Sequence, residues 1–423
     1  MTATELAADE AALPSHAPSQ DLGRLARLLP QDPVLRRLSV ITLINTAGNG
    51  LSMTLSVLFF TRILGFGVAQ VGVVLTVAGA VGLAAGVPAG WLSDRFGPKP
   101  VLVVLLVAQG VCSVGYVLVH DLTVFAVLAC LLAAADRGGM AVRGALFAEV
   151  LPQDGRVAGR AYLRSVTNIG IGLGTVAAAA VLQLDSRGAY LTALLFDGVT
   201  YGVIAVMYLL MVHVPPRTAE QAAKARAEGG VLAVLRDGRY LAATGLNAVI
   251  TLQFVMIEVG VPLWVVRETD APRWMAAGAL LVNTGLVIAL QVRATRGTEE
   301  IGAAARVFRR GALLVAGSCA VLALAAGLPG WAAALVIAAG VGLQALGEVY
   351  SQAGAWALGY DLAKEHAQGA YQGVFNTGMS GAMMFGPVLI TSVVIANGTA
   401  GWLLLAAMFA AAGAGMTLLV RRG

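Results

Sequence analysis

Charged residues are scarce in this 423-residue sequence: Asp, Glu, Lys and Arg make up 12% of it, against 58% hydrophobic residues. A soluble globular domain has about 25% charged residues. The mean hydropathy is +0.81. This composition excludes an ordinary soluble protein. It predicts an all-α polytopic membrane protein that is surrounded by the lipid bilayer.

Cysteine and the motifs of catalysis are also scarce or lacking. The three cysteines lie within apolar runs and show no metal-ligand spacing or disulfide framework. The sequence contains no phosphate-binding loop, zinc motif or His/Ser/Asp constellation. We therefore expect no enzyme activity, no cofactor and no metal. The net charge of +5 is spread over connecting segments, which fits a membrane topology and not nucleic-acid binding.

Long apolar runs predict 12 transmembrane helices. Their expected bounds are 39–62, 68–92, 100–119, 123–146, 162–183, 189–213, 239–264, 274–295, 308–327, 331–354, 370–396 and 399–419. The longest polar connection follows the sixth run and divides the chain into two six-helix bundles. The expected parts are a cytoplasmic N-terminal tail with a short amphipathic helix at 1–37, an N-terminal bundle at 38–214, a cytoplasmic central loop at 215–238 and a C-terminal bundle at 239–423.

The distribution of Lys and Arg predicts the orientation of these helices. With the N-terminus inside, 23 of the 28 Lys and Arg residues fall in inner segments and 4 in outer segments, while Arg137 lies within a span. Positive charge concentrates on the cytoplasmic side of membrane proteins. We therefore expect both termini in the cytoplasm. We also expect the protein to be a monomer in the cell inner (plasma) membrane.

A charged segment, Gly90 to Lys99, joins the second and third apolar runs. Gly86 and Gly90 are four residues apart on one helix face, a spacing that lets another backbone approach closely. Asp94 lies in the last turn of a helix, where the helix dipole disfavours an anion. Its carboxylate is therefore expected to have a partner outside its own helix, such as an arginine or the N-terminus of another helix.

This segment resembles the signature between the second and third helices of the major facilitator superfamily. The matching positions are Gly90, Leu92, Asp94, Arg95, Gly97 and Lys99, whereas Pro98 stands at a position that is usually basic. The resemblance implies two six-helix halves with a substrate site between them. It also implies that Asp94 holds the halves together on the cytoplasmic side in the outward-facing state. The alternative is an ordinary polar hairpin. The corresponding segment of the second half, Arg293 to Thr298, lacks the aspartate, so the latch is expected to depend mainly on Asp94.

Charged residues inside membrane spans are the first candidates for function because burying them is costly. Asp136 and Arg137 lie in the fourth span. We expect them to form a proton relay or an anion-binding site, or else a structural ion pair. Glu258 lies in the seventh span, where we expect it to be a proton carrier or a cation-binding group, or else an outer-rim carboxylate bonded to a neighbouring helix. Pro262 is expected to kink that helix. Asp197 in the sixth span is expected to be structural.

Glu348 lies in the tenth span on one helix face with Gln344 and Gln352. This polar stripe either lines a cavity or forms an interhelical hydrogen-bond ladder. The resemblance implies that the first, fourth, seventh and tenth spans line the central cavity. The cavity-lining candidates on these spans, besides the charged residues, are Asn45, Asn49, Asn247 and Gln344.

These features predict a secondary transporter that moves a small molecule by alternating access. Intramembrane acids and a mostly apolar wall favour a proton-coupled exporter of a drug-like compound or metabolite, with the proton as coupling ion. An importer of a nutrient or metabolite is the alternative within the same fold. A sensor or a lipid scramblase is the alternative from another class.

Overall fold

The structure is a computed structural model that describes residues 30, 32–184, 186–214, 231–295, 298 and 300–421, and every regular element within these ranges is a helix. The expected amphipathic helix near residues 22–29 and residues 215–230 of the expected central loop lie outside the described residues. The first helices are α2 (Pro33–Leu58), α3 (Val68–Phe96), α4 (Pro98–Gly115), α5 (Leu122–Val150), α6 (Arg156–Leu184) and α7 (Arg187–Met211). The later helices are α9 (Val231–Leu235), α10 (Gly238–Val255), α11 (Val261–Glu268), α12 (Met275–Leu290), α13 (Ile301–Ala323), α14 (Gly330–Asp361), α15 (Gln368–Ile390) and α16 (Ala396–Arg421).

Polar side chains at the expected turns start several of these helices. The Asp32 carboxylate accepts a hydrogen bond from the amide of Val34, and Pro33 occupies the first helical position of α2. Asp121 caps α5 by accepting from the amides of Thr123 and Val124, and these bonds hold the pKa of Asp121 below its usual value. These caps satisfy helix amides that have no partner within the helix.

The charged hairpin is tighter than the sequence predicts. α3 continues through Asp94 to Phe96 and α4 begins at Pro98, so Gly97 alone separates them. Gly97 has a φ of 90°, a conformation that other residues rarely adopt. Proline fits the first turn of a helix because its missing N–H has no acceptor there. The expected ends at 92 and 100 are therefore wrong by several residues.

Other boundaries also differ from the expectation. α2 begins at Pro33, within the expected tail, and α9 is a short helix within the expected central loop, where its apolar Val234 is fully buried. Eight helical segments of the described chain are long and apolar enough to cross a membrane, and Gly278–Leu290 is a shorter apolar helix. The count of 12 spans stays a prediction. The helices α2 and α13 are not among these eight segments. α2 contains the polar residues Asn45 and Asn49, and α13 contains three arginines near its start.

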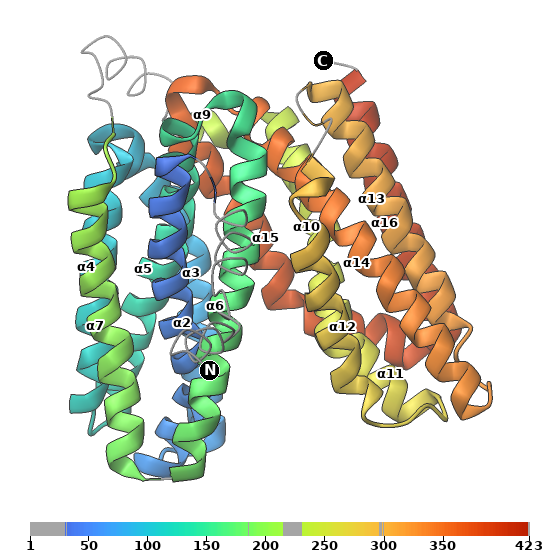
Figure 1. The fold of residues 1–423 in the computed structure, drawn as a ribbon, viewed down its shortest axis with the longest axis horizontal. Coiled ribbons are helices and arrows are strands. Elements are labelled where there is room, and N and C mark those ends of the chain that lie inside the picture. Colours follow the sequence, from blue (N-terminus) through green and yellow to red (C-terminus); the bar gives the residue numbers. More distant parts are fainter. Residues whose placement is uncertain are drawn as a thin grey trace, which may run out of the picture.

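The helices form two groups (Figure 1). In the first group α2 packs against α6 and α7, α3 against α5, and α4 against α5 and α7. In the second, α13 packs against α14 and α16, and α10 against α15 and α16. Each group has its own apolar core, exemplified by Phe60 and Phe125 in the first and by Trp264 and Trp402 in the second. Contacts between the groups involve chiefly α15 with α3 and α5.

Candidate functional site

Asp94 joins the two groups at the end of α3. Its Oδ1 accepts a hydrogen bond of 2.8 Å from the amide of Gly369, and its Oδ2 accepts one of 2.7 Å from the amide of Ala370. Both amides belong to the first turn of α15, where the helix dipole favours an anion. The residue is only 3% exposed. This contact supplies the partner outside its own helix that the sequence predicts for Asp94.

Small residues bring the backbones of α3 and α15 together beside this contact. A Cβ at Gly90 would collide with the carbonyl oxygen of Gly369. A Cβ at Gly373 would lie 2.7 Å from the carbonyl oxygen of Gly86, and one at Gly86 would lie 2.8 Å from the Thr377 hydroxyl. The close approach predicted from Gly86 and Gly90 is therefore a contact between the groups. We call the contact of Asp94, Gly86 and Gly90 with the first turns of α15 the clasp.

The basic residues of the hairpin do not contribute to the clasp. The Lys99 ammonium donates to the carbonyls of Leu209 and Val212, at 2.9 and 2.8 Å, and so caps the end of α7. The Arg95 guanidinium lies over the rings of Trp91 and Phe96, at 5.7 and 5.3 Å. Both residues therefore stabilise the first group alone.

A second contact between the groups surrounds Arg160 of α6. Its guanidinium donates to the Tyr360 hydroxyl at 2.9 Å and to Gln372 Oε1 at 3.4 Å, and it lies 5.3 Å from the ring centroids of Trp356 and Tyr360. The Tyr360 hydroxyl also donates to the carbonyl of Gly144 on α5. We call these four residues, Arg160, Trp356, Tyr360 and Gln372, the arginine clamp. The expectation that a latch depends mainly on Asp94 is therefore incomplete, because arginine spacing along one helix does not reveal an aromatic partner about 200 residues away.

Replacing Arg160 by alanine is expected to lower the population of the closed clamp about tenfold. The change removes charge-assisted hydrogen bonds and two cation–π contacts, which together contribute roughly 1.5–3 kcal/mol. Spin-label distances between the ends of α3 and α14 measure the closed population. Tyr360→Phe keeps the ring and should have a smaller effect. Arg187→Ala, at an exposed arginine on the opposite end of the first group, should leave the distances unchanged. Equal effects at positions 160 and 187 would contradict a specific clamp.

Asp136 and Arg137 form a neighbouring pair on α5. Arg137 Nε lies 3.8 Å from Asp136 Oδ2, and their side chains are 42% and 36% exposed. This pair is therefore not enclosed within a helix interface. Both charges are accessible to a solute or to a proton, as the proton-relay and anion-site interpretations require.

Glu258 lies in an irregular turn of its helix. Residues Met256–Gly260 are π-helical, and Pro262 follows in the first turn of α11, where it cannot donate a backbone hydrogen bond. The Glu258 side chain is exposed. The Arg164 guanidinium of α6 lies 5.7 Å from the ring centroid of Phe254, one helical turn before Glu258. Arg164, a cation of the first group, thus lies beside α10 about one helical turn before this carboxylate. Sequence reasoning missed Arg164 as a site residue.

Glu348 is 4% exposed and belongs to a hydrogen-bond network between α12 and α14. Its Oε2 accepts from Asn283 Nδ2 at 3.1 Å and from Gln344 Nε2 at 3.3 Å. Asn283 Nδ2 also donates to Gln344 Oε1 at 2.6 Å. This geometry supports the interhelical-ladder interpretation of the stripe.

The three asparagine candidates have different surroundings. Asn49 Oδ1 accepts from the Tyr201 hydroxyl of α7 at 2.7 Å, so this contact ties α2 to α7. The cavity-lining role of Asn49 stays a prediction. Asn247 is 1% exposed, and neither of its amide atoms has a hydrogen-bond partner in the part of the chain that the structure describes. Asn45 Oδ1 is likewise buried without a described partner.

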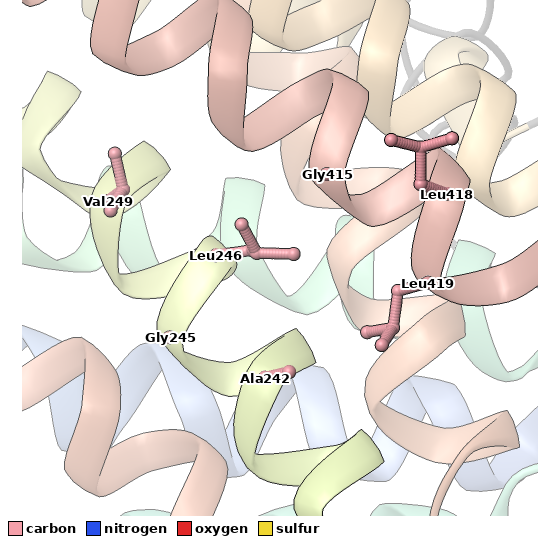
Figure 2. Close-up of a pocket in the computed structure, with 7 residues that line it drawn as sticks. All are labelled: Ala242, Gly245, Leu246, Val249, Gly415, Leu418 and Leu419. Atoms are coloured by element: carbon pink, nitrogen blue, oxygen red, sulfur yellow. The ribbon is translucent and has the colours of Figure 1, made fainter.

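A crevice of about 510 Å³ lies between α10 and α16 (Figure 2). The lining residues are Ala242, Gly245, Leu246, Val249, Gly415, Leu418 and Leu419. None of these side chains is polar. The crevice therefore offers no group that recognises a polar solute, and it lies apart from the charged residues described above.

Comparison with protein families agrees with this architecture. The family model described as Major Facilitator Superfamily matches residues 38–387. The chain belongs to the Major Facilitator Superfamily. The resemblance drawn from the Gly90–Lys99 segment is thereby confirmed at the level of the family. Family membership indicates a transporter rather than an enzyme.

Solved structures of this superfamily share the fold. The human organic anion transporter MFSD10 (TETRAN) has a TM-score of 0.68 and 14% identity, covering 92% of this chain and 99% of its own. The E. coli fucose:proton symporter FucP has a TM-score of 0.67 and 14% identity, with coverage of 92% and 98%. The proton:xylose symporter XylE has a TM-score of 0.64 and 12% identity, with coverage of 92% and 95%. A comparison with curated protein sequences gave no match.

Proposed function

We propose that this protein is a secondary active transporter that exports a small, partly apolar compound in exchange for protons. It works by alternating access in the cell inner (plasma) membrane, as a monomer with both termini in the cytoplasm. The observation that carries the proposal is the clasp. A buried carboxylate that bonds the N-terminus of a helix in the other group is a contact that can break and re-form without unfolding either group.

The closed end is the cytoplasmic one in this proposal. The clasp and the arginine clamp both lie where α3, α5 and α14 end and where α6 and α15 begin. The excess of Lys and Arg near these helix ends supports a cytoplasmic location. In Figure 1 the two groups diverge toward the end that carries α11. The structure then corresponds to a state closed toward the cytoplasm.

We assign proton coupling to charged residues within the expected membrane spans. Glu258 is exposed on an irregular turn, near a helix that contributes the cation Arg164. A proton on Glu258 would remove its attraction to Arg164 or to a cationic solute, so protonation and substrate binding would compete. Asp136 and Glu348 are further candidates. FucP and XylE, which share this fold, are proton symporters, and this supports the proposal of proton coupling here.

Replacing Glu258 by glutamine is expected to abolish accumulation driven by a pH gradient, while exchange at equal pH continues. The amide keeps the shape of the side chain but cannot bind and release a proton. The measurement is flux across proteoliposomes over a panel of compounds, with and without an imposed pH gradient. Glu268→Gln, at an exposed carboxylate at the end of α11, should behave as wild type. Full gradient-driven flux in the Glu258 variant would exclude it as the coupling group, and the same loss in both variants would show a non-specific effect.

The same panel separates the alternative functions. Net movement into the compartment equivalent to the cytoplasm under a physiological gradient would favour an importer of a nutrient or metabolite. Movement of labelled lipids without any solute flux would favour a scramblase. Binding of a compound without flux would favour a sensor.

A further inference from the structure

Asp197 is a buried carboxyl group that the proposed transport mechanism does not use. It lies within α7 and is 2% exposed. Its Oδ2 accepts a hydrogen bond of 3.1 Å from the Ser113 hydroxyl of α4. Its Oδ1 is buried and has no hydrogen-bond partner among the described residues. One oxygen of this carboxyl is therefore held in place while the other has an unused acceptor position.

The groups around Asp197 are polar but carry no positive charge. α2 contributes the Ser52 hydroxyl, α4 contributes the Ser113 hydroxyl, and α7 itself contributes Tyr201. In the described ranges no Lys, Arg or His lies within ion-pair distance of Asp197. An ionised carboxylate in a membrane interior needs a counter-charge or a proton. Because the surroundings supply no counter-charge, proton binding is the remaining way to neutralise the group.

Close packing leaves room for a proton but not for a hydrated ion. A Cβ at Gly48 of α2 would lie 2.7 Å from both Asp197 Oδ1 and the Thr200 hydroxyl. The backbone of α2 is thus pressed against the unused oxygen. A metal cation would need several oxygen ligands at defined distances, whereas a proton adds directly to Oδ1.

The helix that covers Asp197 connects it to the contacts between the groups. On α2, Asn49 follows Gly48 and bonds Tyr201, one turn beyond Asp197 on α7. The opposite side of α2 packs closely on α6, where a Cβ at Gly174 would collide with the carbonyl oxygen of Ala47. α6 carries Arg160 of the clamp and Arg164 near Phe254. A change of charge beside Gly48 therefore acts on a helix that is packed against the one bearing the clamp.

We infer that Asp197 is a proton-binding site that loads and releases a proton during the transport cycle. The proton comes from the aqueous phase and forms an O–H bond at Oδ1, while Oδ2 keeps the hydrogen bond from Ser113. The carboxyl becomes neutral, which changes the interaction of α7 with α2. The role in transport rests on the function proposed above, whereas the binding of the proton does not depend on it.

Infrared titration of the purified full-length protein tests the site without a substrate. Between about pH 5 and about pH 9, the window in which buried carboxyls titrate, the wild type should show the carbonyl band of a buried un-ionised acid at low pH. The component of that band that belongs to Asp197 should disappear as pH rises and be missing in Asp197→Asn, whereas Glu348→Gln, at the other deeply buried candidate acid, should retain it. Glu258→Gln should retain it. Ser113→Ala keeps the carboxyl and should move the midpoint by about one pH unit, the equivalent of one hydrogen bond to a charged group.

Three results would overturn the inference: a wild-type band that stays constant across this range, a band that is identical in the wild type and in Asp197→Asn, or no such band at any pH. If Asp197→Asn fails to fold, Ser113→Ala decides the matter, since an unchanged midpoint contradicts titration at this position.

A distance measurement tests the coupling. In a protein with its three cysteines replaced, spin labels at Phe96→Cys and Lys364→Cys report closure between the groups. Without substrate, pH should change the closed fraction at least threefold in the wild type but not in Asp197→Asn. If Asp197 titrates but closure depends on pH in Asp197→Asn as it does in the wild type, the role of Asp197 in the transport cycle is overturned, whereas proton binding at this site is not. Loss of gradient-driven flux in Glu258→Gln is a separate result, which concerns the proposed function and not the site at Asp197.

Discussion

Gly90→Val is expected to reduce transport at least tenfold and to prevent closure at the signature end of the molecule. A Cβ at position 90 collides with the backbone of Gly369, and backbone cannot move aside as a flexible side chain can. Overpacking a close contact costs roughly 1–3 kcal/mol, and about 1.4 kcal/mol changes an equilibrium tenfold. The open state of the clasp loses nothing by the change. Transport in proteoliposomes and label distances between the groups measure the two effects.

The same helix supplies the control for this variant. Gly79 lies on α3, and a Cβ there would have no neighbour within 4 Å among the described residues. Gly79→Val should therefore leave both flux and label distance close to wild type. Wild-type closure in Gly90→Val would contradict the close approach of α3 and α15, and equal losses in both variants would attribute the effect to valine in the helix.

Asp94→Asn is expected to lower the closed population about tenfold or more and to slow transport accordingly. An amide side chain has one acceptor oxygen, so one of the two α15 amides loses its partner. The negative charge at the helix N-terminus disappears as well. A hydrogen bond to a charged group contributes about 1.5–3 kcal/mol, and the charge at the helix end adds about 0.3–1 kcal/mol. The label pair at the ends of α3 and α14 gives the closed fraction, and flux gives its consequence.

Asp121→Asn is the matched control, because Asp121 also accepts two helix amides but caps its own helix, α5. It should change neither closure nor flux by more than about twofold, since asparagine is also a good N-cap. Normal closure in Asp94→Asn would show that the glycine contact and the arginine clamp suffice without this carboxylate.

The clasp was predictable from sequence on one side only. A glycine pair with helical spacing and an aspartate in the last turn of a helix both indicate a partner, since each is unfavourable alone. The partner itself, the first turn of α15, lies some 275 residues later. Gly369 and Gly373 have the same four-residue spacing as Gly86 and Gly90, but many glycines of this chain have it, so the pattern does not select them.

For the other polar and charged candidates, the sequence located the residues but did not reveal their partners. Glu258 and the stripe of Glu348 were located because an acid in an apolar run stands out. Asn49 is likewise a polar residue in an apolar run, but it accepts a hydrogen bond from Tyr201 within the first group. Arg160 and Arg164 sit near the start of a long helix, where the sequence indicates only the inner side of the membrane. Their importance depends on Tyr360 and Phe254, which belong to the other group.

Composition, apolar runs and the distribution of Lys and Arg determined by themselves that this is a helical membrane protein, and the Gly90–Lys99 segment pointed to its family. These properties depend on local hydrophobicity and charge, which each stretch of chain carries on its own. Only the tertiary structure decided that Asp94 meets α15, that Arg160 meets Tyr360 and that Asp197 is left with one unused oxygen. Such contacts depend on which distant helices pack together, and in an apolar chain many pairings satisfy the same local pattern.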